Sequence, residues 1–312
     1  MSNELYDVII IGGGPAGLSA GIYAGRGLLK TLIIEKSKHG GQAAMTNEID
    51  NYPGADLEET GPSLIDKMFK QAERFGVEFE ADDIKDVSFD GDVKTLTGSK
   101  GTYSAKTVII ATGAFPRTLG CPGEKELTGK GVSYCATCDA AFFEELEVYV
   151  VGGGDSAVQE AMFIARFARK ITIIQNLPEL TAAKSLQQKV LNDPKFSFVY
   201  NSVVEELKGE EGLLDTIIIK NEKTGELTEF KADEEDGTFG LFVFIGLIPQ
   251  TDIFESKIKM DRGYIPTDEN MRTNVPGVYA VGDCRIKPLR QVVTAAADGA
   301  IAAMDIEHFL SK

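Results

Sequence analysis

The stretch from Gly131 to Phe143, GVSYCATCDAAFF, carries the residues most able to do chemistry. Cys135 and Cys138 are separated by two small residues, and the carboxylic acid Asp139 follows them directly. Two thiols at this spacing can close a disulfide and open it again, and a neighbouring acid can move the proton. A disulfide across so short a loop restricts the unfolded chain by only about 2 kcal/mol, less than a long structural bridge gives. The spacing therefore predicts a redox dithiol, with Cys135, Cys138 and Asp139 as its catalytic residues. A second role stays open for Asp139, that of an acid that stabilises a helix N-terminus through the macrodipole.

A CxxC pair is also half of a common zinc site. The sequence has no second CxxC, however, and its only histidines are His39 and His308. We therefore expect no metal. The two remaining cysteines, Cys121 and Cys284, stand alone in the sequence, and we expect them to be unpaired thiols.

The composition is that of a long acidic chain. Its 312 residues leave room for two domains and a well-buried core. The net charge of -16 and the lack of a long basic run argue against nucleic-acid binding. The apolar N-terminal run lacks the basic start of a signal peptide, and no other run reaches the ~20 residues that span a bilayer. Because four cysteines do not make a secreted disulfide framework, we expect a soluble cytoplasmic protein without membrane contact.

Two segments, which begin at Tyr6 and Leu146, repeat one another at an offset of 140 residues without a gap. Each reads as a strand, a glycine loop, a helix and a second strand, which is the context of a dinucleotide-binding fold. The first glycine of such a loop permits the turn, the second admits a pyrophosphate, and the helix start offers free N–H groups to the anion. The loop positions are Gly12, Gly14 and Gly17 in the first copy and Gly152, Gly154 and Ala157 in the second. A plain tight turn stays open as the alternative, more so for the second copy.

The two copies differ at the end of their second strand. An acid at this place accepts hydrogen bonds from ribose hydroxyls. Glu35 and Gln175 each stand 18 residues after the third loop position of their copy. The sequence therefore predicts an intact nucleotide site in the first copy and a defective one in the second.

Polar or glycine-rich turns after apolar runs supply further candidates for cofactor contact. One irregular loop follows Glu35, a helix is predicted over 61–75, and a small-residue helix is predicted over 290–310. The candidate residues in these turns are Gly41, Gln42, Asn51, Ala111, Thr112, Gly113, Gly282, Asp283, Arg290 and Gln291.

The motifs GGGPAG, GGQ, NYPG, ATG, CATCD, GGGDSA, GDC and RQVVTAA stand in the order found in the low-molecular-weight flavoprotein thioredoxin reductases, and the chain resembles that family over essentially its whole length. The resemblance implies an α/β fold of two Rossmann-like domains of the glutathione-reductase type. An FAD-binding domain would comprise 1–114 and 245–312, and an inserted domain, 115–244, would carry the CxxC.

The resemblance also implies roles for individual residues and an assembly. Cys138 would face the flavin, Cys135 would attack the disulfide of thioredoxin, and the protein would be a homodimer. The FAD ligands implied by the matching motifs are Gly12, Gly14, Gly17, Glu35, Gln42, Asn51, Asp283 and Gln291.

The second nucleotide unit departs from the pattern of NADPH-using members. Those follow the loop with H-R-R-x-x-x-R, whose arginines bind the 2′-phosphate. A lost charge-assisted hydrogen bond costs roughly 1.5–3 kcal/mol, and about 1.4 kcal/mol is tenfold in affinity, so NADPH is a doubtful cofactor here. NADH is not a better cofactor either, because Gln175 is not the acid that binds the ribose of NADH. Gln159 also replaces the acid that precedes Glu160 in the family. The residues at the places of the histidine and the three arginines are Gln175, Asn176, Leu177 and Thr181.

The departure resembles the ferredoxin-dependent flavin thioredoxin reductases, which keep the two-domain fold without using the nucleotide. The sequence thus favours electron flow from reduced ferredoxin through FAD and the dithiol to thioredoxin. An NADPH-dependent thioredoxin reductase is the alternative. A dithiol oxidase using oxygen and a flavin-bound redox-sensing module remain as rivals. Peroxide formed from a small dithiol without ferredoxin would favour the oxidase, and a dithiol unable to exchange electrons with FAD would favour the sensor.

Overall fold

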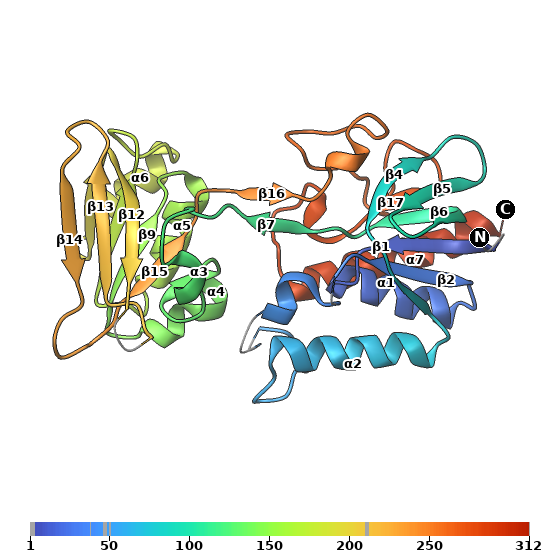
Figure 1. Cartoon of the computed structure of the whole chain (residues 1–312), viewed down its shortest axis with the longest axis horizontal. Helices are drawn as coiled ribbons and strands as arrows, with labels where there is room; N and C mark the ends of the chain where they lie inside the picture. Colours follow the sequence, from blue (N-terminus) through green and yellow to red (C-terminus); the bar gives the residue numbers. More distant parts are fainter. Residues whose placement is uncertain (1–3, 38, 46–48, 50, 210–211, 312) are drawn as a thin grey trace. The chain divides into compact units, whose positions relative to one another are not determined.

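The computed structural model describes residues 4–37, 39–45, 49, 51–209 and 212–311. The chain forms two compact units, one made of Met1–Phe115 with Ile248–Lys312 and the other of Pro116–Leu247 (Figure 1). The sequence places these limits at 114/115 and 244/245. Two short strands, β7 (Ala114–Pro116) and β16 (Leu247–Pro249), pair with each other where the chain passes from one unit to the other.

The first unit is built on a sheet in the order β3-β2-β1-β6-β5-β4, with β17 also paired to β6. Strands β1, β2, β3, β6 and β17 run parallel, whereas β4 and β5 pair antiparallel. The strands are β1 (Leu5–Ile11), β2 (Thr31–Glu35), β3 (Glu78–Ala81), β4 (Ile84–Ser88), β5 (Lys94–Gly98), β6 (Thr102–Ile110) and β17 (Val278–Ala280). The helices are α1 (Pro15–Arg26), α2 (Gly61–Arg74) and α7 (Val292–Leu310), with 3-10 turns η1 (Gly41–Met45), η3 (Asp252–Phe254) and η4 (Gly282–Cys284).

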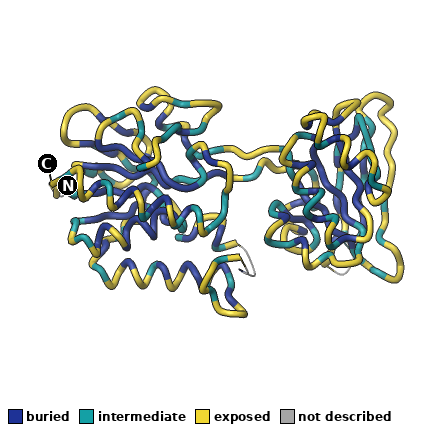
Figure 2. Tube along the Cα trace, turned by 180° about the vertical axis from the view of Figure 1, so that it is seen from behind, coloured by how far each residue is buried: buried dark blue, intermediate teal, exposed yellow. Residues whose placement is uncertain are grey.

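The central strand β1 shows why this sheet needs cover on both faces. Val8 and Ile10 join the core formed with the helices, and Ile9 and Ile11 join a second core formed with β4, β5 and η3. A parallel strand buried on both faces reads as a continuous apolar run, as LYDVIII does. Figure 2 shows the buried strands as dark segments inside an exposed outer layer.

The second unit repeats this plan with a five-stranded parallel sheet in the order β11-β10-β9-β15-β8. Its strands are β8 (Val132–Ser133), β9 (Glu147–Val151), β10 (Lys170–Gln175), β11 (Phe196–Tyr200) and β15 (Gly240–Val243). An antiparallel sheet adds β12 (Ser202–Lys208), β13 (Thr216–Asn221) and β14 (Leu227–Lys231). The helices are α3 (Glu124–Leu127), α4 (Ala136–Asp139), α5 (Asp155–Ile164) and α6 (Lys184–Leu191), with the 3-10 turn η2 (Ala140–Phe143).

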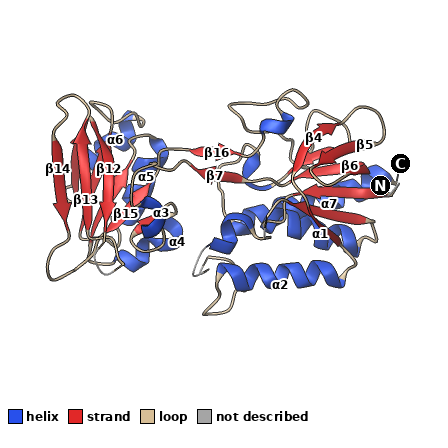
Figure 3. Cartoon of the chain, in the orientation of Figure 1, coloured by secondary structure: helices blue, strands red, loops and turns tan. Residues whose placement is uncertain are grey.

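Strand β9 packs as β1 does. Val148 and Val150 face the core of the helices, and Tyr149 and Val151 face the core shared with the antiparallel sheet. The internal repeat is therefore structural: β1, α1 and β2 in one unit correspond to β9, α5 and β10 in the other. Figure 3 shows that each unit combines strands with helices. The predicted α/β fold of two Rossmann-like units is confirmed.

The helix predicted over 61–75 is α2, and the helix predicted over 290–310 is α7. The sequence predicts an irregular loop after Glu35, and this prediction is wrong for Gly41–Met45, which form the 3-10 turn η1. In the described part of the chain, no helix is both long and apolar enough to cross a membrane.

Candidate active site and nucleotide loops

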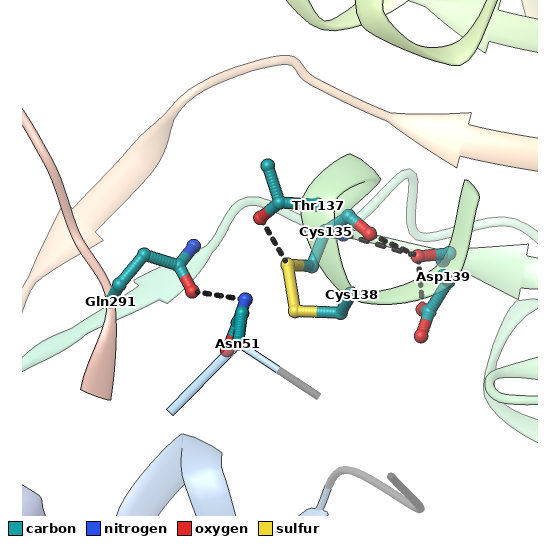
Figure 4. Close-up of a disulfide and its surroundings, with 7 residues drawn as sticks. Asn51, Cys135, Thr137, Cys138, Asp139 and Gln291 are labelled. Atoms are coloured by element: carbon teal, nitrogen blue, oxygen red, sulfur yellow. Dashed lines mark hydrogen bonds between the residues drawn. A yellow bond between two sulfur atoms is a disulfide. The ribbon is translucent and has the colours of Figure 1, made fainter. Parts of the chain in front are cut away.

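The dithiol lies on the short helix α4. Cys135 precedes the helix and Cys138 lies within it, and the two are joined by a disulfide with their Cα atoms 5.3 Å apart (Figure 4). Both cysteines are half-buried, so a reaction partner can reach them. Cys121 and Cys284 are free thiols, as predicted. The structure thus confirms the predicted pairing.

Asp139 is held by a residue that the sequence analysis does not single out. Ser133, at the end of β8, donates a hydrogen bond from Oγ to Asp139 Oδ2 at 2.5 Å and accepts one from the Cys135 N–H at 3.1 Å. Burial raises the pKa of the Asp139 carboxyl, and the bond from Ser133 lowers it, with a raised pKa as the result. The carboxyl group therefore keeps its proton to a higher pH than an exposed aspartate, which suits a proton donor. The only sequence signal for Ser133 is its place two residues before Cys135.

The first glycine loop has the geometry that a nucleotide site requires. Gly12 adopts φ +111°, and a Cβ there would overlap the carbonyl oxygen of Ala111. A Cβ on Gly17 would overlap the carbonyl oxygen of Gly12. Gly14 precedes the first turn of α1, and Glu35 Oε2 accepts a hydrogen bond from the Gly13 N–H at 2.8 Å. The loop and the acid at the strand end therefore contact each other.

Three other candidates have buried polar atoms without a hydrogen-bond partner among the described residues: Thr112 Oγ1, Asp283 Oδ1 and Arg290 Nε. Burial raises the pKa of Asp283, although Lys287 and Arg290 oppose the shift. Buried polar atoms of a folded protein normally have partners, so these atoms point to a bound polar group. This unit therefore fits the predicted flavin nucleotide.

The remaining candidate residues of the first unit differ in burial and in backbone conformation. Asn51 Nδ2 donates to Gln291 Oε1 at 3.1 Å, although the two residues lie 240 positions apart (Figure 4). Gly41 and Gln42 are exposed on η1. Ala111 is buried beyond the end of β6, Gly113 has φ +69°, and Gly282 opens η4 with φ +73°.

A buried ion network holds the turn that carries Asp283. Asp298, on α7, accepts hydrogen bonds from the Gly282 N–H at 3.0 Å and from Lys287 Nζ at 2.7 Å. It also accepts from Arg285 Nε at 2.9 Å and Nη2 at 2.8 Å. These donors hold the pKa of Asp298 below its usual value despite burial.

The second glycine loop keeps the shape of the first. Gly152 adopts φ +124°, and the Thr181 N–H donates to the Gly153 carbonyl at 2.8 Å. The Gly40 N–H donates to the Gly13 carbonyl in the same way, also at 2.8 Å.

The end of the second strand differs, as predicted. Gln175 is buried, and its Nε2 donates to the Glu179 carbonyl at 3.4 Å. The run 176–183 contains no lysine or arginine. The Thr181 hydroxyl is bonded to the Gly153 carbonyl at 3.2 Å. The second unit therefore presents a complete loop without basic side chains in the segment beside it.

Comparison with known proteins shows the family to which the chain belongs. The family described as pyridine nucleotide-disulphide oxidoreductase matches residues 6–299. The thioredoxin reductase of Peptoclostridium litorale is 58% identical over 310 residues, covering 99% of this chain and 98% of that protein. The chain belongs to the thioredoxin reductases of this family. The crystal structure of thioredoxin reductase from Streptococcus pyogenes is 43% identical with a TM-score of 0.92, covering 99% of each chain. A ferredoxin-flavin thioredoxin reductase from Clostridium acetobutylicum is more distant, at 28% identity and a TM-score of 0.52, covering 98% of each chain.

Proposed function

We propose that this protein is a thioredoxin-disulfide reductase whose Cys135–Cys138 pair carries electrons from FAD to thioredoxin. The observation that carries the proposal is the accessible disulfide beside Asp139, a carboxyl group with a raised pKa. In the exchange, the Cys135 thiolate attacks one sulfur of the substrate disulfide, and the displaced sulfur leaves as a thiolate that takes up a proton. Asp139 supplies that proton. The name of the relatives supports thioredoxin as the substrate.

Replacement of one cysteine tests this role. Cys135→Ser removes the attacking thiolate and is expected to stop thioredoxin reduction while the flavin stays bound and photoreducible. Cys121→Ser is the matched control, because it removes a free thiol from the same unit and should leave the reaction intact. Full activity of Cys135→Ser would refute the proposal.

Family membership implies FAD, and the first unit supplies residues to hold it. When bound, FAD would supply two-electron redox chemistry for the disulfide. Gly12 and Gly14 would leave room for the pyrophosphate, and Glu35 would accept hydrogen bonds from a ribose. Asp283 and Thr112 would pair their free oxygens with polar groups of the cofactor. The other proposed contacts are Gly17, Gly41, Gln42, Asn51, Ala111, Gly113, Gly282, Arg290 and Gln291.

For the electron donor, the comparisons favour the alternative, an NADPH-dependent thioredoxin reductase, over a ferredoxin-dependent one. Relatives with 45–59% identity along almost their whole length are called thioredoxin reductases, whereas the ferredoxin-flavin enzyme is 28% identical. The complete loop from Gly152 to Gly154 also supports pyrophosphate binding. Because the run 176–183 has no basic residue, we propose that the site gains little from the 2′-phosphate and accepts NADPH and NADH within about tenfold of one another.

Ferredoxin remains the second candidate because of one observation, the buried neutral Gln175 in place of a ribose-binding acid. Anaerobic titration of the flavin absorbance separates the two donors. Bleaching by NADPH or NADH supports the first. Bleaching by reduced ferredoxin, with no bleaching by NADPH or NADH, would overturn the nucleotide as donor in favour of ferredoxin. Peroxide formed from a small-molecule dithiol and oxygen would instead indicate a dithiol oxidase. A Cys135–Cys138 pair that exchanges no electrons with the flavin would indicate a redox-sensing module.

We also propose a homodimer in the cytoplasm. The outer face of α7 exposes Val293, Ile301 and Met304, apolar side chains that a second copy could cover. The free thiols of Cys121 and Cys284 are consistent with a reducing compartment.

A further inference from the structure

The Ser133 hydroxyl joins the carboxyl group beside the dithiol to the backbone of the attacking cysteine. It lies 2.5 Å from Asp139 Oδ2, 3.1 Å from the Cys135 nitrogen and 3.4 Å from the Cys135 carbonyl oxygen. Ser133 is 4% exposed, and its strand β8 pairs in parallel with β15 through Phe242. The sheet therefore fixes the position of the hydroxyl oxygen, while its hydrogen is free to rotate.

This arrangement serves both protonation states of Asp139. With the carboxylate, the hydroxyl donates to Oδ2 and accepts from the Cys135 N–H. With the carboxylic acid, the acid proton can be donated to the serine oxygen, and the serine hydrogen turns to the Cys135 carbonyl. A charge-assisted hydrogen bond is stronger than a neutral one, so the serine favours the carboxylate without excluding the acid.

We propose that Ser133 is a positioning residue that orients the Asp139 carboxyl group for proton transfer during disulfide exchange. The proposal rests on the reductase function proposed above. When the Cys135 thiolate displaces a sulfur of the substrate disulfide, one S–S bond forms and one breaks. The leaving sulfur keeps the electron pair and takes the Asp139 proton, which leaves a carboxylate that Ser133 stabilises.

Other charged groups do not account for the behaviour of Asp139. Helix α5 packs against α4 and carries two carboxyl groups, Asp155 and Glu160. Asp155 accepts a hydrogen bond from the Ala183 N–H at 2.6 Å, and burial alone raises the pKa of Glu160. Strand β8 and the turn η2 carry no charged residue. Burial and the bond from Ser133 are the two causes of the Asp139 shift.

The test is a titration of the Asp139 carboxyl carbon by ¹³C NMR in the oxidised, FAD-loaded protein, with Asp139→Asn to assign the signal. Ser133→Ala should raise the midpoint by about one pH unit, the difference between a charge-assisted and a neutral hydrogen bond. Ser133→Thr keeps a hydroxyl and should restore the midpoint. Ser202→Ala is the matched control, because it removes another buried serine hydroxyl of the same unit, bonded to the Tyr200 carbonyl at 2.9 Å.

In Ser133→Ala, the pH profile of thioredoxin reduction should shift in the same direction as the Asp139 titration midpoint. The substitution should lower kcat and leave KM unchanged. An unchanged midpoint, or an equal shift in Ser202→Ala, overturns the proposal. If Ser133→Ala fails to fold, Ser133→Cys, which donates only weakly, must show the upward shift instead. The titration needs no turnover, so its failure is distinct from a failure of the reductase function, which would appear as absent thioredoxin reduction in the unaltered protein.

Discussion

Replacement of Asp298 by asparagine should destabilise the first unit far more than loss of an ordinary ion pair. The Asp298 side chain is 6% exposed, and its partners Lys287 and Arg285 are 3% and 16% exposed. Asp298→Asn keeps the size of the residue but removes the carboxylate that pairs with the buried Lys287 and the half-buried Arg285. Removing one partner of such a group costs about 3–5 kcal/mol.

The same substitution should loosen the cofactor turn, because the Gly282 N–H loses its carboxylate acceptor next to Asp283. Urea unfolding of the FAD-free protein measures the stability, and fluorescence titration with FAD measures the affinity. The control is Asp66→Asn, which breaks an exposed pair with Lys70 and should cost less than about 0.5 kcal/mol.

The sign of the pH dependence follows from the low pKa of Asp298. A carboxyl group whose pKa is lower in the folded protein stabilises the fold above the unfolded value, here 3.8, and loses that effect as the pH falls through the folded pKa. The difference in the free energy of unfolding between the unaltered protein and Asp298→Asn should therefore be complete at pH 7 and should decrease only below about pH 4. Equal losses in Asp298→Asn and Asp66→Asn at pH 7 would refute this account of the network.

Three further predictions concern the loops, the cofactor and the assembly. Gly17→Ala should destabilise the protein by about 1–3 kcal/mol and impair FAD binding, because the added methyl group would overlap the Gly12 carbonyl oxygen. The equivalent change in the second loop, Ala157→Gly, should cost only about 0.5–1 kcal/mol, and thermal unfolding measures both. Glu35→Gln should weaken FAD binding about tenfold in a titration, since one charge-assisted hydrogen bond is lost, and unchanged affinity would remove Glu35 from the site. Ile301→Glu should convert the proposed dimer to a monomer in light scattering, and a dimer of unchanged affinity would exclude this face of α7.

The features predictable from the sequence are those whose chemistry is local. The loops at Gly12 and Gly152 depend on a strand, a turn and a helix that are contiguous, so their spacing alone predicts them. The disulfide likewise closes within four residues, Cys135 to Cys138. Glu35 could be placed because the strand that ends there belongs to the same repeat.

The features that escaped prediction depend on contacts between separate elements. Ser133 reaches Asp139 because β8 ends beside α4, which no periodicity in GVSYCATCD reveals. Asp298 lies in a helix of small residues, and its role becomes visible only when α7 packs beside the turn at Gly282. The Asn51–Gln291 bond joins two loops that the sequence related only through family resemblance.

Delivery of flavin electrons to thioredoxin by the Cys135–Cys138 pair can be tested without knowing the natural donor. The FAD-loaded protein is reduced by light under anaerobic conditions, oxidised thioredoxin is added, and its new thiols are counted. We expect two thioredoxin thiols for each two-electron equivalent in the unaltered protein and none in Cys135→Ser, although the flavin is photoreduced in both. Equal thiol formation in the two proteins, or none in either, would contradict this expectation.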